Sequence, residues 1–147
     1  MEQQAAGRYT PLLSSVRLVR IPADGILSAW PIVEPLLAKA TGRTMKLDTD
    51  NVKDLALDGM MQVWTAFDTD DKSVLAAFVT DIADFPSGTR AARILLMGGS
   101  ELDSLVHLME DFERWAVDEG CDTVEIVGRP GWGKIHPNYI EIERTFS

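Results

Sequence analysis

The segment Arg93-Ile94-Leu95-Leu96-Met97-Gly98-Gly99-Ser100-Glu101-Leu102 decides the fold. Its apolar run stops at two glycines, and Ser100 is followed three positions later by Asp103, which is the spacing of a helix capping box. Apolar residues then recur every three or four positions as far as Gly120, and a second β-prone run follows at 123–127. We therefore expect a strand, a tight turn, a capped helix and a second strand parallel to the first.

The crossover helix is predicted over residues 101–118. Its apolar face should lie on the sheet and is formed by Leu102, Leu105, Val106, Met109, Phe112 and Ala116. The other face should lie in water and carries Glu110, Asp111, Glu113 and Arg114. Trp115 is one position off the apolar stripe, so it is either a packing residue or part of a contact surface.

The N-terminal part of the chain predicts an edge strand at 16–21 and two helices. The first helix has its apolar residues between 26 and 40 and ends at Gly42. Pro31 and Pro35 lie inside it, so the helix is either kinked or starts at Pro31. The second helix is shorter and ends at Gly59, with Asp50 and Asn51 as its expected caps.

Three β-prone runs follow, at 61–67, 74–79 and 92–97. A charged turn at 68–72 and the Pro86-Ser87-Gly88 turn connect them, so they should form an antiparallel meander. The alternating segment 139–146 predicts a last strand at the edge of the sheet.

Length and composition predict one domain at 16–147, preceded by a flexible tail at 1–15. The net charge of the 147 residues is −9, which disfavours nucleic-acid binding. The chain has no apolar run long enough for a bilayer and no signal peptide, so we expect no membrane contact and a soluble, intracellular protein. His107, His136 and the single Cys121 lack the spacing of metal ligands, so we expect no metal site.

Four segments of the C-terminal part carry a family resemblance: Leu95-Leu96-Met97-Gly98-Gly99, Phe112-Glu113-Arg114-Trp115-Ala116, Gly120-Cys121-Asp122 and Val124-Glu125-Ile126-Val127-Gly128-Arg129-Pro130-Gly131-Trp132. Together with the order of elements, they resemble the GNAT superfamily of acyl-CoA-dependent N-acetyltransferases over residues 16–146. They look most like small GNAT-like proteins of tailed phages and prophages. The resemblance implies an α/β (α+β) fold with a mixed, mostly antiparallel sheet, flanking helices and a parallel β-α-β crossover.

The resemblance also implies a place for acetyl-CoA along the fourth strand and the start of the next helix. Leu96, Gly98, Gly99 and Ser100 would form this cradle, because free backbone N–H groups and a helix N-terminus favour an anion. The family's usual loop, a Gln or Arg followed by Gly-x-Gly or Gly-x-Ala, is absent, and the acidic Glu101 and Asp103 would repel a phosphate. Gly98-Gly99-Ser100 is therefore either a structural turn with a capping box or a working cofactor site.

Two residues are candidates for proton transfer. Tyr139 lies near the place where the family often has a Tyr that protonates the leaving thiolate, with core packing as its alternative role. Glu125 is either a general base or a polar side chain on the less buried face of its strand.

These observations leave two functions open. The first is an acetyl-CoA-dependent N-acetyltransferase with a degenerate cofactor loop. The alternative is a non-catalytic binding or structural module for phage particle assembly or host interaction, with phage structural or host proteins as partners. Both place the protein in the host cytoplasm, and the second also on the virion. The sequence leaves homo-oligomerisation open.

Overall fold

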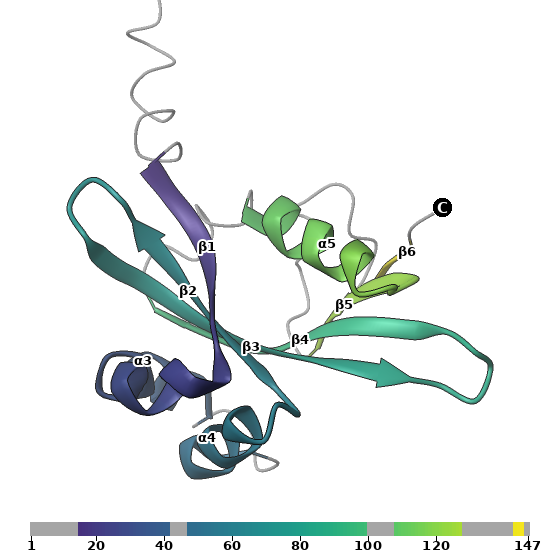
Figure 1. Cartoon of the computed structure of the whole chain (residues 1–147), viewed down its shortest axis with the longest axis horizontal. Coiled ribbons are helices and arrows are strands. Elements are labelled where there is room, and N and C mark those ends of the chain that lie inside the picture. The colour runs from purple at the N-terminus through teal and green to yellow at the C-terminus, as the bar shows by residue number, and fades with distance from the viewer. Residues whose placement is uncertain (1–14, 42–46, 100–107, 128–142, 146–147) are drawn as a thin grey trace, which may run out of the picture.

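The computed structural model describes residues 15–41, 47–99, 108–127 and 143–145 (Figure 1). Its strands are β1 (Val16–Ile21), β2 (Gln62–Asp68), β3 (Ser73–Asp84), β4 (Arg90–Gly99), β5 (Thr123–Ile126) and β6 (Glu143–Thr145). Its helical elements are the short 3-10 helix η1 (Ala23–Gly25) and the α-helices α3 (Ile26–Thr41), α4 (Thr49–Leu57) and α5 (Met109–Asp118).

The six strands form one sheet in the order β1-β2-β3-β4-β5-β6. All neighbouring strands are antiparallel except β4 and β5, which are parallel and place Ile94 opposite Ile126. The predicted meander, the parallel pair and the mixed, mostly antiparallel sheet are therefore confirmed. Only 143–145 of the predicted last strand lies within the described residues, and this part pairs with β5.

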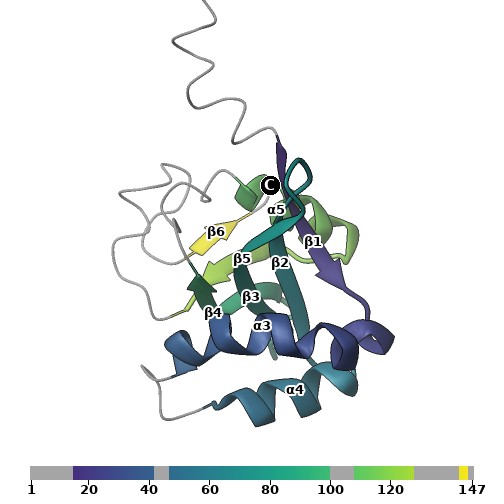
Figure 2. The ribbon, with the colours of Figure 1, turned by 90° about the vertical axis from the view of Figure 1, so that its left-hand side faces the viewer.

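Helices cover both faces of the sheet (Figures 1 and 2). On one face, α3 and α4 enclose the α3-side core, which consists of Ile26, Val33, Leu37, Val52, Ala56, Val63, Ala77, Val79 and Leu96. On the other face, α5 lies over the α5-side core, whose largest residues are Trp64, Phe78, Ile94, Met97, Met109, Phe112 and Ile126. In β2 and β3 the residues of the two cores alternate, because successive side chains of a strand point to opposite faces.

The helix α3 begins at Ile26 and contains both prolines, so a start at Pro31 is wrong. Both Pro31 and Pro35 are exposed. Their rings and missing N–H groups therefore lie on the outer side of the helix, where the disturbance of the backbone does not reach the core. The predicted end at Gly42 lies just outside the described residues.

Asp48, rather than Asp50, caps α4. Asp48 Oδ1 accepts a hydrogen bond from the Asn51 backbone N–H at 2.8 Å, and Asn51 Oδ1 accepts one from the Asp48 N–H at 3.2 Å. This reciprocal pair needs a spacing of three residues, which Asp50 and Asn51 do not have. Gly59 follows the helix with a φ of 77°, as expected for a C-terminal stop.

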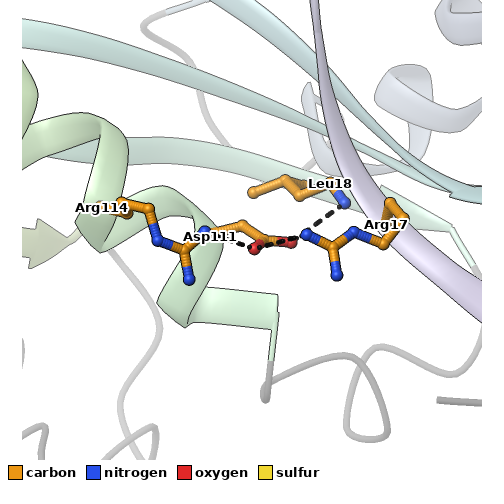
Figure 3. A network of polar contacts seen from close by, with 4 residues as sticks. All are labelled: Arg17, Leu18, Asp111 and Arg114. Atoms are coloured by element: carbon orange, nitrogen blue, oxygen red, sulfur yellow. Dashed lines mark hydrogen bonds and ion pairs between the residues drawn. The ribbon is translucent and has the colours of Figure 1, made fainter. Parts of the chain in front are cut away.

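The described part of the crossover helix is α5, and its predicted start at 101 lies outside the described residues. A carboxylate of α5 ties the helix to the edge strand β1 (Figure 3). Asp111 Oδ1 accepts hydrogen bonds from Arg17 at 3.3 Å and Arg114 at 3.2 Å, and Asp111 Oδ2 accepts one from the Leu18 N–H at 3.4 Å. The network holds α5 over the sheet.

Glu113 is buried, with 8% of its surface exposed, so its predicted place on the water-facing side is wrong. It lies four residues after Met109 and three before Ala116, both of which are in the α5-side core. Residues at these spacings share a helix face, so Glu113 lies on the packed side. Trp115 packs against the same core, with its ring centroid 5.2 Å from that of Trp64 and 5.8 Å from that of Phe112.

Candidate functional site

The parallel pairing of β4 with β5 ends before β4 does. It covers Ala91 to Ile94 of β4, and its last bond runs from the Val127 N–H to the Ile94 carbonyl oxygen at 2.9 Å. From there to Gly99, β4 pairs only with β3 among the described residues. We call this stretch, residues 95–99, the open edge of β4. Backbone groups on such an edge can bind an extended ligand in place of a strand.

A β-bulge lies at the start of the open edge. Thr80 of β3 is opposite Ile94 and its neighbour Val79 is opposite Leu96, so Leu95 is the extra residue. The bulge changes the alternation of side chains: Ile94 belongs to the α5-side core, whereas Leu95 and Leu96 both lie on the α3 side. Bulges of this kind bend a strand and often lie beside functional sites.

Gly98 and Gly99 are the last residues of β4, so the predicted turn at these glycines is wrong. A Cβ at Gly98 would lie 1.8 Å from the Leu36 carbonyl oxygen, because the backbone of α3 packs directly on the strand there. Gly99 has a φ of 140°, and a Cβ there would lie 2.5 Å from the Leu75 carbonyl oxygen. Close backbone contacts therefore require glycine at both positions.

Of the predicted cradle residues Leu96, Gly98, Gly99 and Ser100, the structure describes the first three. Leu96 is 7% exposed and belongs to the α3-side core, so its backbone rather than its side chain is available to a ligand. Together with the glycines it lies on the open edge of β4. Ser100 and Tyr139 lie outside the described residues, and their roles stay predictions.

Glu125, the predicted base, lies on β5 directly opposite Arg93 of β4. Arg93 in turn forms an ion pair with Asp81 of β3, to which it donates hydrogen bonds from Nε at 2.9 Å and from Nη2 at 2.8 Å. The pKa of Arg93 is raised above its usual value, mainly because Asp81 accepts these bonds, and the negative charges of Asp81 and Glu125 add to the effect. Asp81, Arg93 and Glu125 thus form a row of charged residues on the neighbouring strands β3, β4 and β5, beside the bulge.

The Arg93–Asp81 pair is not part of the predicted site, but the sequence contains a signal for it. The turn centred on Ser87 places residues at equal distances on either side opposite one another. Asp81 and Arg93 are each six residues from Ser87, and the outer pair Asp84 and Arg90 are each three residues from it. The signal is therefore a hairpin turn flanked by oppositely charged residues at equal spacing.

On the opposite face of the sheet, a small hollow lies beneath α5 next to the bulge. Its walls are apolar apart from one hydroxyl and are formed by Leu18, Trp64, Phe78, Thr80, Ile94, Leu108, Met109 and Phe112. Thr80 Oγ1 accepts a hydrogen bond from Trp64 Nε1 at 2.9 Å and donates one to Gln62 Oε1 at 3.0 Å. The hydroxyl is therefore occupied within the sheet, and the hollow is a packing feature next to the candidate site.

Cys121 is a buried free thiol. Burial raises its pKa above the ordinary value, although a hydrogen bond with Arg90 acts in the opposite direction. Within the ranges that the structure describes, no three His, Cys, Asp or Glu side chains gather to hold a metal ion. Over the same ranges, no helix has the length and apolar character to cross a membrane.

The chain has the GNAT fold. The features that define this fold class are the antiparallel meander, the parallel β4–β5 crossover and a β4 that extends beyond its pairing with β5. Solved acetyltransferase structures share it over most of their length. No model of a known protein family matches the chain, and no curated protein sequence does.

Individual solved structures are similar at low sequence identity. An aminoglycoside acetyltransferase from an uncultured soil metagenomic sample, in complex with trehalose, has a TM-score of 0.64 at 9% identity, covering 87% of this chain and 91% of its own. A predicted acetyltransferase from Clostridium acetobutylicum, solved with acetyl-CoA, has a TM-score of 0.57 at 13% identity, covering 84% of this chain and 88% of its own. Tetrahymena GCN5 has a TM-score of 0.57 at 8% identity, covering 90% of this chain and 96% of its own. At these identities the likeness shows the fold alone.

Proposed function

We propose that the protein binds acetyl-CoA along the open edge of β4 and transfers the acetyl group to an amine. The observation that carries this proposal is the end of β4–β5 pairing at Ile94, five residues before β4 itself ends. The pantetheine arm of the cofactor is extended and carries amides, so it can pair with a strand edge as another strand would. A solved structure of the same fold that contains acetyl-CoA supports the choice of cofactor.

In the proposed reaction, the amine nitrogen attacks the thioester carbonyl, the new C–N bond forms and the C–S bond breaks. The amine loses a proton and the leaving thiolate gains one. Glu125 is the candidate acceptor of the first proton, because it lies on β5 beside the end of the parallel pairing. Tyr139 is the candidate donor of the second.

Thermal unfolding with and without acetyl-CoA tests cofactor binding. At a concentration of 100 times the dissociation constant, a ligand stabilises the folded state by about 2.7 kcal/mol. For a domain of this size we expect the melting temperature to rise by roughly 5–10 °C. An unchanged melting temperature at millimolar acetyl-CoA would contradict the proposal.

Replacing the candidate base tests catalysis separately from binding. We expect Glu125→Gln to lower kcat by at least about 100-fold, because the amide cannot accept the proton. The KM for acetyl-CoA should stay unchanged, since the substitution keeps the shape of the side chain. Glu119→Gln, at an exposed position just after α5, is the matched control and should keep wild-type kcat. A Glu125→Gln variant with wild-type kcat would remove Glu125 from the mechanism.

A second candidate function is a non-catalytic module in phage particle assembly or host interaction. The absence of the family's Gln or Arg glycine loop and the acidic Glu101 and Asp103 favour it. On this proposal the cofactor loop is degenerate, and the protein works in the host cytoplasm or on the virion. Absence of acetyl-CoA binding, together with sedimentation of the protein with purified phage particles, would support this function over the first.

A further inference from the structure

The outer face of α3 is mostly apolar and its exposed positions include no carboxylate, although the chain has a net charge of −9. At 100° per residue its exposed positions fall within an arc of roughly 140°. They are Leu27, Ser28, Pro31, Ile32, Pro35, Ala38 and Lys39. Leu27 is 64% exposed and Ile32 is 55% exposed. A surface helix normally has charged residues on this side, so a face without a carboxylate on so acidic a protein needs an explanation.

We propose that two copies of the chain pair through this face, with their α3 helices antiparallel about a two-fold axis between Pro31 and Ile32. In such an arrangement, residues at equal distances from the axis lie opposite each other. Pro31 of one copy then lies opposite Ile32 of the other, and Ser28 lies opposite Pro35. This is an isologous interface, in which the same patch of both copies is used.

Charge complementarity at the ends of the face supports a second copy as the partner. Asp24 lies in η1, which leads directly into α3, and it is exposed. Lys39, in the last turn of α3, is also exposed. The two residues are the same number of positions from the proposed axis, since Asp24 is seven before Pro31 and Lys39 is seven after Ile32. Antiparallel pairing therefore places each Asp24 opposite Lys39 of the other copy.

The resulting interface has an apolar centre and a charged rim, as protein interfaces commonly do. Pairing through any carboxylate-rich surface would bring like charges together, whereas the α3 outer face avoids this repulsion. A membrane surface fits the face less well. Helices that lie on anionic lipid carry several basic residues beside their apolar face, and here Lys39 is the single basic residue among the exposed positions of α3.

Sedimentation equilibrium of the full chain tests the proposal. We expect a wild-type dimer, and Ile32→Glu should weaken dimerisation by at least about 100-fold, because two carboxylates would meet beside the axis. Val117→Glu changes a 54% exposed apolar residue on α5 and should leave the dimer unchanged. Circular dichroism checks that both variants are folded. A monomeric wild type, or an Ile32→Glu variant that dimerises as wild type does, would overturn the proposal.

A charge exchange tests the antiparallel register. Asp24→Lys alone and Lys39→Asp alone should each weaken the dimer by roughly 10-fold, since each creates two like-charge contacts. The double variant restores both pairs with reversed signs and should dimerise nearly as wild type does. A double variant weaker than either single variant would overturn the register. Binding of a monomeric wild type to phosphatidylserine vesicles, or to another protein, through the same face would overturn the choice of partner.

Discussion

At Gly98 the backbone of α3 packs directly on the backbone of the sheet. We expect Gly98→Ala to lower the free energy of unfolding by about 3 kcal/mol, because a Cβ 1.8 Å from the Leu36 carbonyl oxygen forces the helix away from β4. Gly25→Ala is the matched control, since its Cβ would make an ordinary contact at 3.5 Å with Ile21, and it should change stability by less than about 0.5 kcal/mol. Urea denaturation measures both. Equal losses in the two variants would contradict the assigned packing.

Cys121 predicts a dependence of stability on alkaline pH. Burial raises its pKa in the folded state, so the folded protein holds the thiol proton more tightly than the unfolded chain does. The stability from this preference is fully present below the ordinary thiol pKa, about 8.5, and is lost as the pH rises through the folded-state pKa.

The test compares wild type with Cys121→Ala, because lysines and tyrosines also titrate in this range. From about pH 8 upward, the free energy of unfolding of the wild type should fall relative to that of Cys121→Ala. Denaturation midpoints at a series of pH values measure it. A difference that is independent of pH would show that the thiol has the same pKa in both states.

Some residue-scale features follow from sequence and others do not. Asp81 and Arg93 could be paired from their equal distances to Ser87. Glu113 could be placed on the packed face from its spacing to Met109. The bulge at Leu95 could not be found, because Ile94 to Met97 are all apolar and a shift of one residue leaves no polar position to reveal it.

At the scale of elements, Asp111 joins α5 to the edge strand β1. We expect Asp111→Ala to lower the free energy of unfolding by about 1–2 kcal/mol, because the Leu18 N–H loses its acceptor and two arginines lose their partner. Most of the loss should persist at high salt, since both arginines are more than half exposed and their ion pairs contribute little.

Asp118→Ala, an exposed carboxylate on the same helix, is the control for this prediction and should be nearly neutral. Guanidinium is unsuitable as the denaturant because it screens ion pairs, so urea at low and high sodium chloride is the measurement. If Asp111→Ala and Asp118→Ala lose the same stability, Asp111 does not join the elements.

The type and order of the elements were predictable, because apolar periodicity and turn residues identify them locally. Their exact limits depended on interactions beyond the pattern. The prolines of α3 were compatible with a helix from Ile26 only because they lie on its outer side. The cap of α4 moved from Asp50 to Asp48 because reciprocal bonding with Asn51 needs a spacing of three residues.

At the scale of the whole molecule, the sheet brings together segments that are far apart in the chain. The parallel pairing of β4 and β5 followed from a helical connection between two strands. Where that pairing stops could not be predicted, since the apolar runs of both strands continue past Ile94 and Ile126. The open edge of β4, on which the proposed function depends, is therefore a finding of the structure.

Amide hydrogen exchange of the intact protein, with and without saturating acetyl-CoA, tests the central claim most directly. We predict that acetyl-CoA slows exchange in peptides covering the open edge, residues 95–99, because the cofactor covers backbone that no β5 residue covers. Peptides from β2, which lies between two strands, should be unchanged. Saturating acetyl-CoA that leaves exchange of residues 95–99 unchanged would contradict the account.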